Sequence, residues 1–161
     1  MIDYSRPEFK TIFANYGLTA VAAVSLEKTL LYLIAAIDHL GKETNAPSTY
    51  LEKHRKATLG QLIRDLNKRV HIPAEMYSKL KIALEKRNEV VHNFFVEQYE
   101  TMLLPNGPAH LSNQLRPIRD LFSSAYSEVD ILLGKVSVQL NKPKNEISPE
   151  VRKILKGKLA I

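Results

Sequence analysis

A short stretch of the chain, EKRNEVVHNFF from Glu85 to Phe95, places polar and charged groups inside an otherwise apolar segment. Arg87 and His92 are five positions apart, and Asn88 directly follows the arginine. Histidine, with an ordinary pKa of about 6.5, can transfer protons near neutral pH, and the arginine fork binds phosphate or carboxylate oxygens. The stretch is therefore either the solvated flank of a helix or a site that combines anion binding with proton transfer.

The apolar residues around this motif predict a long helix from Pro73 to about Leu104. Its predicted core stripe consists of Leu80, Leu84, Val91, Phe95 and Met102. Arg87 falls near the centre of that stripe, and a buried guanidinium needs a partner. We expect an ion pair with Glu27, the only acidic residue between positions 13 and 36.

Asn88 and His92 lie at the border of the stripe, four residues apart, where the amide could hydrogen-bond the imidazole and orient it. Arg87 and His92 themselves diverge by about 140° on a regular α-helix, so one copy is poorly placed to aim both at a single phosphate. Two copies about a two-fold axis could bring them into one cleft, which predicts a composite site in a homodimer. The alternative is structural: an Arg87–Glu27 pair at the edge of the core with a local hydrogen bond beside it.

Proline, glycine and capping signals divide the chain into helices. The predicted ranges are 7–41, 58–70, 73–104 and 111–140, followed by a short helix that begins at Ser148. Thr58 and Gln61 form a capping box, and Pro117 lies in the first turns of the fourth helix or kinks it. The prediction is an all-α, up-and-down bundle of four main helices plus a short C-terminal helix.

A single domain over 1–161 is expected, with its core at about 7–141 and a basic extension at 142–161. The chain contains no cysteine, and its start does not resemble a signal peptide, which together favour a cytoplasmic protein. The apolar stretch 17–37 carries Glu27 and Lys28 in its middle, so a core helix is favoured over a membrane span. The net charge of +6 is compatible with a polyanionic partner.

RNEVVH is an Arg-x4-His motif with a polar residue after the arginine, on the third long helix of an all-α chain. In this position, with the flanks YGLTAVAAVSLEKTLLYL, ATLGQLIRDL and ALEKRNEVVHNFF, it resembles the HEPN superfamily (higher eukaryotes and prokaryotes nucleotide-binding domains). The resemblance covers roughly residues 9–140. It implies a HEPN-like fold and metal-independent cleavage of single-stranded RNA by a homodimer, in a toxin or antiviral-defence setting. Other members have lost catalysis and serve as binding or scaffolding modules.

The resemblance also implies a role for each residue of the motif. Arg87 would stabilise the phosphate, His92 would act as the acid or base, and Asn88 would orient or contact the phosphate. The 2′-hydroxyl of RNA would attack its neighbouring phosphate and give a 2′,3′-cyclic phosphate and a free 5′-hydroxyl. Glu27 would support this site, and neither a metal ion nor a cofactor is implied.

Two further features concern partners. Lys53, Arg55 and Lys56 form a basic run that could contact an RNA backbone, the alternative being a solvated helix end. Phe94 stands where several HEPN toxins carry a tyrosine that a partner nucleotidyltransferase modifies. Neutralisation by a cognate antitoxin of that kind is therefore in doubt, whereas toxin function is not excluded. The alternative function is a catalytically inactive HEPN-like module that binds RNA or protein.

Overall fold

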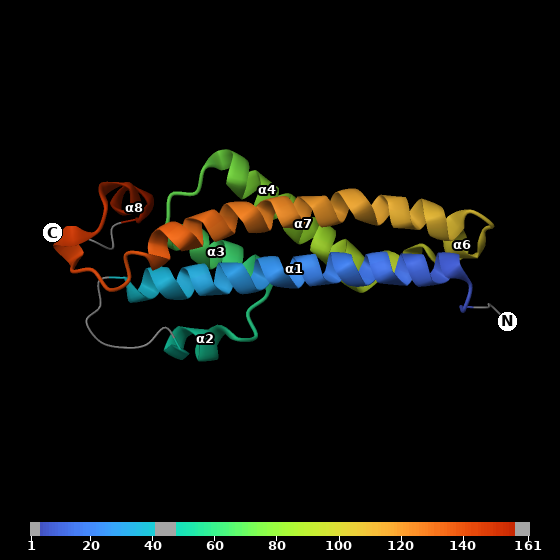
Figure 1. Cartoon of the computed structure of the whole chain (residues 1–161), viewed down its shortest axis with the longest axis horizontal. Helices are drawn as coiled ribbons and strands as arrows, with labels where there is room; N and C mark the ends of the chain where they lie inside the picture. The colour runs from blue at the N-terminus through green and yellow to red at the C-terminus, as the bar shows by residue number, and fades with distance from the viewer. Residues whose placement is uncertain (1–3, 41–47, 157–161) are drawn as a thin grey trace.

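The computed structural model describes residues 4–40 and 48–156, with side chains from 51 onward in the second range. Within those ranges the chain folds into helices, and its one extended pairing is an isolated bridge between Val70 and Leu155. The predicted all-α class is therefore confirmed. Figure 1 shows an elongated bundle whose two longest helices, α1 (Pro7–His39) and α7 (Gly107–Ser137), lie side by side.

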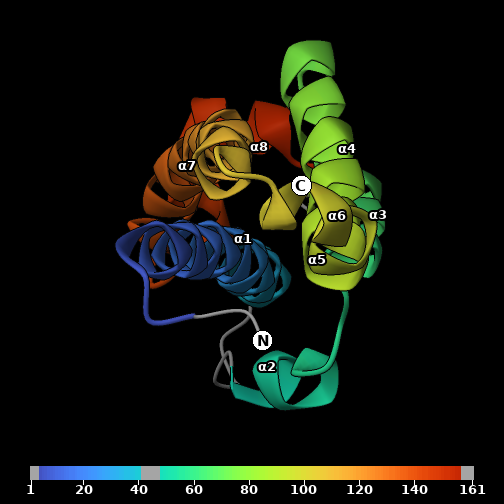
Figure 2. The same cartoon turned by 90° about the vertical axis from the view of Figure 1, so that its right-hand side faces the viewer.

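The packing of α1 against α7 forms the main axis of the bundle. Residues of α1 spaced three or four apart form a buried stripe, joined by half-buried Tyr16; it comprises Ile12, Thr19, Ala23, Leu26, Leu30, Leu33 and Ile37. α7 begins four residues earlier than the predicted 111 and continues through Pro117 to Ser137. Both helices run in the same direction in Figures 1 and 2, so the strict up-and-down alternation that we predicted does not hold for this pair.

α1 is also long and apolar enough, by length and composition, to span a membrane. In the most apolar window of this helix, 56% of the residues are buried inside the protein. A mostly buried core helix and a signal sequence near the N-terminus both pass the same test.

Two shorter helices, α2 (Ser48–His54) and α3 (Leu59–Arg69), follow α1. The predicted capping box is present. The backbone N–H of Gln61 donates to Thr58 Oγ1, and the backbone N–H of Thr58 donates to Gln61 Oε1 at 2.8 Å. The helix α2 lies between the first two predicted helices, in a stretch for which we predicted no helix. The end of α3 is tied to α1 by Arg69, whose Nε and Nη2 donate to Asp38 at 2.9 Å each.

The third long helix is not continuous, which corrects the prediction for 73–104. It consists of α4 (Ala74–Asn88), a π-helical turn η1 (Glu89–Asn93), α5 (Phe94–Glu97) and α6 (Tyr99–Leu103). A π turn closes i→i+5 hydrogen bonds, so it holds one residue more than an α turn and rotates everything after it by about 100°. The predicted stripe is correspondingly wrong at Val91, which is 40% exposed, while Val90 and Phe94 are buried instead.

The C-terminal segment packs against the far end of the bundle. After a 3-10 turn, η2 (Lys144–Glu146), the helix α8 (Pro149–Ile154) begins with Ser148 as its cap, as predicted. Backbone hydrogen bonds from His71 to Ile154 (2.7 Å) and from Lys156 to Arg69 (2.8 Å) fix this segment beside the end of α3. Residues 157–161 of the predicted basic extension lie outside the described ranges.

Candidate functional site

Arg87 lies in the last turn of α4, on the side that faces α1. Its Nε donates to Glu27 Oε1 at 3.0 Å, so the expected ion pair is present. The two side chains are only 22% and 19% exposed. A guanidinium this deeply placed needs a countercharge. Glu27 supplies that charge and also holds the Arg87 side chain in one orientation.

His92 lies next to Arg87 in the same chain. Arg87 Nη1 and His92 Nε2 are 3.3 Å apart, although we predicted that the two side chains would diverge. The cause is η1, because one extra residue in the turn rotates position 92 back towards position 87 by about 100°. π turns of this kind occur frequently at functional sites.

Asn88 takes a different partner from the one predicted. Its Oδ1 accepts from Arg87 Nη1 at 3.4 Å, and the structure shows no hydrogen bond between Asn88 and His92. Both residues are exposed, whereas Arg87 is half-buried. The guanidinium therefore has its Nε towards Glu27 in the interior and its Nη1 towards Asn88 and His92 at the surface.

The contact between Arg87 and His92 has a defined direction as a hydrogen bond. An arginine side chain can only donate, so His92 Nε2 is the acceptor. At 3.3 Å the hydrogen bond is longer than the usual N–H···O range of about 2.7–3.2 Å. An incoming anion can replace Nε2 as the acceptor of Arg87 and leave a free nitrogen lone pair beside it.

Aromatic packing against the first half of α1 anchors the segment that follows the π turn. The Phe95 ring lies 4.7 Å from that of Tyr16 and 5.5 Å from that of Phe13, centroid to centroid. Phe94 contacts both Phe95 (5.3 Å) and Tyr16 (6.1 Å). Phe94 and Phe95 thus serve as core residues, which is the simplest role that the sequence suggested for them.

No family model, curated protein or solved structure matches the chain. Comparison with known proteins therefore assigns no function. The candidate site rests on its own geometry: a half-buried arginine held by a carboxylate, and a histidine within hydrogen-bonding distance of it. Among the described residues no three His, Asp or Glu side chains are grouped as a metal ion would require.

Of the basic run predicted to contact RNA, Lys53 and Lys56 line a hollow of about 430 Å³ between α2 and α3, and Arg55 does not. Arg64 and Lys68 of α3 line the same hollow, together with Asp65. Sequence reasoning missed these two cations, although positions 64 and 68 are four apart and so share one face of the helix.

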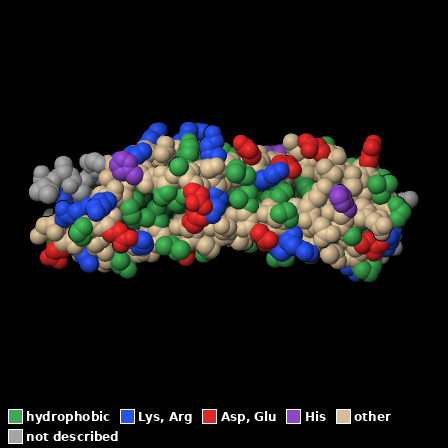
Figure 3. Space-filling model, turned by 90° about the horizontal axis from the view of Figure 1, so that it is seen from above, with side chains coloured by type: hydrophobic (Ala, Val, Ile, Leu, Met, Phe, Trp, Pro, Cys, Tyr) green, Lys and Arg blue, Asp and Glu red, His purple; other side chains and the backbone are tan. Residues whose placement is uncertain are grey.

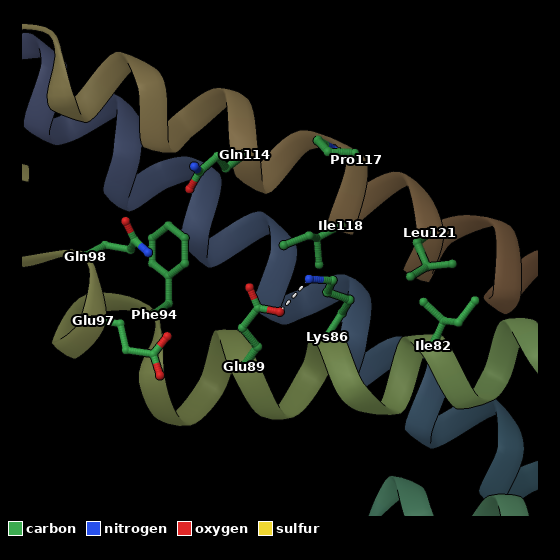
Figure 4. A pocket seen from close by; sticks show the side chains of 10 residues that line it. All are labelled: Ile82, Lys86, Glu89, Phe94, Glu97, Gln98, Gln114, Pro117, Ile118 and Leu121. Carbon is green, nitrogen blue, oxygen red and sulfur yellow. Dashed lines mark hydrogen bonds and ion pairs between the residues drawn. The ribbon is translucent and has the colours of Figure 1, made fainter. Parts of the chain in front are cut away.

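A larger cavity, of about 470 Å³, lies between α7 and the segment formed by α4, η1 and α5. Figure 4 shows its apolar floor, with Phe94 and Ile118, and the ion pair between Lys86 and Glu89 at 2.6 Å. Figure 3 views the molecule from above, where hydrophobic side chains gather along the middle of this face. Neither Arg87 nor His92 lines the cavity, so it is separate from the candidate site.

Proposed function

We propose that this protein is a HEPN-like, metal-independent endoribonuclease that cleaves single-stranded RNA in the cytoplasm, in a toxin or antiviral-defence setting. The observation that carries the proposal is the contact between Arg87 Nη1 and His92 Nε2 at 3.3 Å. It brings together a fixed positive charge and a proton acceptor, the two groups that attack by a 2′-hydroxyl on its own phosphate requires.

The geometry supports the following sequence of steps. A non-bridging oxygen of the scissile phosphate takes the place of His92 Nε2 as the acceptor of Arg87. The freed Nε2 removes the proton of the 2′-hydroxyl, whose oxygen attacks phosphorus to form the 2′,3′-cyclic phosphate. The bond from phosphorus to the 5′-oxygen breaks, and that oxygen leaves with a proton from a second acid. Asn88 Oδ1, beside Arg87 Nη1, helps to hold the guanidinium in place.

The second acid is the reason to propose a homodimer. Each copy places one histidine at Arg87, and a second copy facing it would supply another. Exposed apolar side chains adjoin the site on both sides: Val91 precedes His92 and is 40% exposed, and Val24, one turn before Glu27 on α1, is 52% exposed. Their burial would stabilise an association of two copies at this face.

The Arg87–Glu27 pair favours a second candidate function. A largely buried ion pair between α1 and α4 can also serve only to hold the two helices together. In that case the protein is a catalytically silent module that binds RNA or protein, and Arg87 and Glu27 stabilise its fold. The two candidates differ in one respect: only the first predicts the formation of a cyclic phosphate.

The test is incubation of the purified protein with single-stranded RNA in EDTA, followed by analysis of the fragment ends. Wild-type protein should give 2′,3′-cyclic phosphate and 5′-hydroxyl ends, and His92→Ala should cut the rate by about 100-fold or more, the usual contribution of general acid–base catalysis. Arg87→Ala should lose activity as well. His110→Ala, which removes an exposed histidine of α7, is the matched control and should cleave normally.

RNA binding without fragments, in wild-type protein and variants alike, would overturn the ribonuclease and leave the silent module. Activity that disappears when EDTA is added would instead show that the reaction depends on a metal ion.

A further inference from the structure

The hollow between α2 and α3 concentrates positive charge. Lys53, Lys56, Arg64 and Lys68 line it with a single carboxylate, Asp65, so the formal charge of this lining is 4 − 1 = +3. The whole chain has a net charge of +6. Half of that excess therefore lies around one concave surface, a distribution that the order of residues in the sequence does not reveal.

Little of this charge is neutralised by neighbouring groups. Lys68 lies 3.7 Å from Asp65 but its side chain is 74% exposed, which makes the pair weak. Lys53, Lys56 and Arg64 make no ion pair within the described part of the chain. Unpaired cations that face one hollow produce a local positive potential that attracts polyanions.

The hollow adjoins the helix that carries the catalytic motif. At Gly60, in the first turn of α3, an added Cβ would lie 3.3 Å from Leu84 of α4 and 3.7 Å from Arg64 Nη1. Arg64 and Leu84 thus flank the same point, and Leu84 is one α-helical turn before Asn88. The helix that carries Arg87 and Asn88 therefore packs directly beside the hollow.

The hollow beside α2 and the cavity against α7 also differ in charge and side. Figures 1 and 2 place α2 on the side of α1 away from α7, whereas the larger cavity lies against α7. That cavity is lined by Glu89 and Glu97 with Lys86, so its lining carries a formal charge of 1 − 2 = −1. A nucleic-acid backbone is therefore attracted to the hollow beside α2 and repelled from the other cavity.

We propose that the hollow lined by Lys53, Lys56, Arg64 and Lys68 binds the sugar–phosphate backbone of the RNA strand whose scissile phosphate lies at Arg87 and His92. This deepens the proposed function and rests on it for the identity of the strand. Apart from His54, the lining holds no aromatic side chain on which bases could stack, so its contacts are mainly with phosphates and depend little on base sequence.

Binding is tested first, with a short fluorescent 2′-O-methyl oligonucleotide, which lacks the attacking hydroxyl and cannot be cleaved. The variant K53Q/K56Q/R64Q/K68Q is compared with K10Q/R116Q/K142Q/K153Q, which removes the same charge from exposed sites elsewhere. Loss of four phosphate contacts to a single strand should reduce the slope of log K against log salt by about 2.8, and affinity at 0.1 M salt by about tenfold or more. The control variant should keep nearly the wild-type slope.

Cleavage of unmodified RNA is the second measurement. The hollow variant should raise KM and leave kcat nearly unchanged, because it removes binding remote from the reacting phosphate. Equal losses of salt slope in the two variants, or none in either, would overturn the proposal. A third outcome separates the two proposals. If the wild-type protein cleaves no RNA, and only the hollow variant shows a reduced salt dependence of binding, then the backbone site is supported and the ribonuclease proposal is wrong.

Discussion

At the scale of single residues, Arg87 illustrates what the sequence could and could not show. Its position on the core line of a predicted helix, with one acidic residue available on the first helix, was enough to predict the ion pair with Glu27. Its contact with His92 was not predictable, because regular α-helical geometry places the two residues far apart. The Asn88–His92 hydrogen bond was predicted from the same regular geometry and is absent for the same reason.

The structural and chemical roles of Arg87 can be separated by mutation. Breaking a buried ion pair costs about 3–5 kcal/mol, and because about a fifth of each side chain is exposed here, we expect Glu27→Met to cost about 1–3 kcal/mol. Glu27→Met with Arg87→Met should recover most of that stability, since no unpaired charge remains, yet cleave no RNA. Urea unfolding and the cleavage assay measure the two effects. If the double variant lost as much free energy of unfolding as the two single variants together, this interpretation would be contradicted.

At the scale of elements, the sequence predicted correctly those features that depend on residues a few positions apart, such as helix caps. The capping box at Thr58 and Gln61 and the cap at Ser148 were predicted, since each needs only residues three positions apart. The π turn and the breaks after it escaped prediction, because no residue type marks the insertion of one residue into a helical turn. The helix α2 escaped as well, in a stretch where polar residues and a proline favoured a loop.

Two glycines of α7 give a matched test of local packing. At Gly107 an added Cβ would lie 1.7 Å from the Thr101 carbonyl oxygen, so Gly107→Ala must displace the α6–α7 connection and should cost about 2 kcal/mol or more. At Gly134 nothing lies within 4 Å, so Gly134→Ala should stabilise the same helix by about 0.5–1 kcal/mol. Chemical denaturation of both variants measures the difference. A Gly107→Ala protein as stable as wild type would contradict this close approach.

At the scale of the whole molecule, the all-α class followed from helical periodicity alone, but the arrangement of the helices did not. α1 and α7 run in the same direction, and the basic hollow gathers residues from α2 and α3. Both features depend on how separate elements pack. The predicted homodimer has also lost its first justification, because Arg87 and His92 already meet within one copy; the need for a second proton-transfer group now supports it.

The proposed dimer face can be tested through its apolar side chains. Val24→Glu introduces a charge beside the candidate site and should convert a dimer to a monomer in light scattering, with about a tenfold or greater loss of cleavage if the second histidine is required. Val138→Glu is the control, because Val138 is 68% exposed and follows the last turn of α7, a helix that carries no residue of the candidate site. A wild-type protein that is monomeric at assay concentrations and still cleaves RNA would exclude a composite site.

The π turn makes the site depend on the number of residues in the segment as well as on their identity. Two side chains five positions apart cannot meet on a regular α-helix, but a π turn aligns them. Deleting one residue between Arg87 and His92 would place them four positions apart, a spacing that on an ordinary α-helix again puts both side chains on one face. The site therefore requires a match between the spacing of the arginine and histidine and the type of helical turn between them: five positions with a π turn, or four with an α turn.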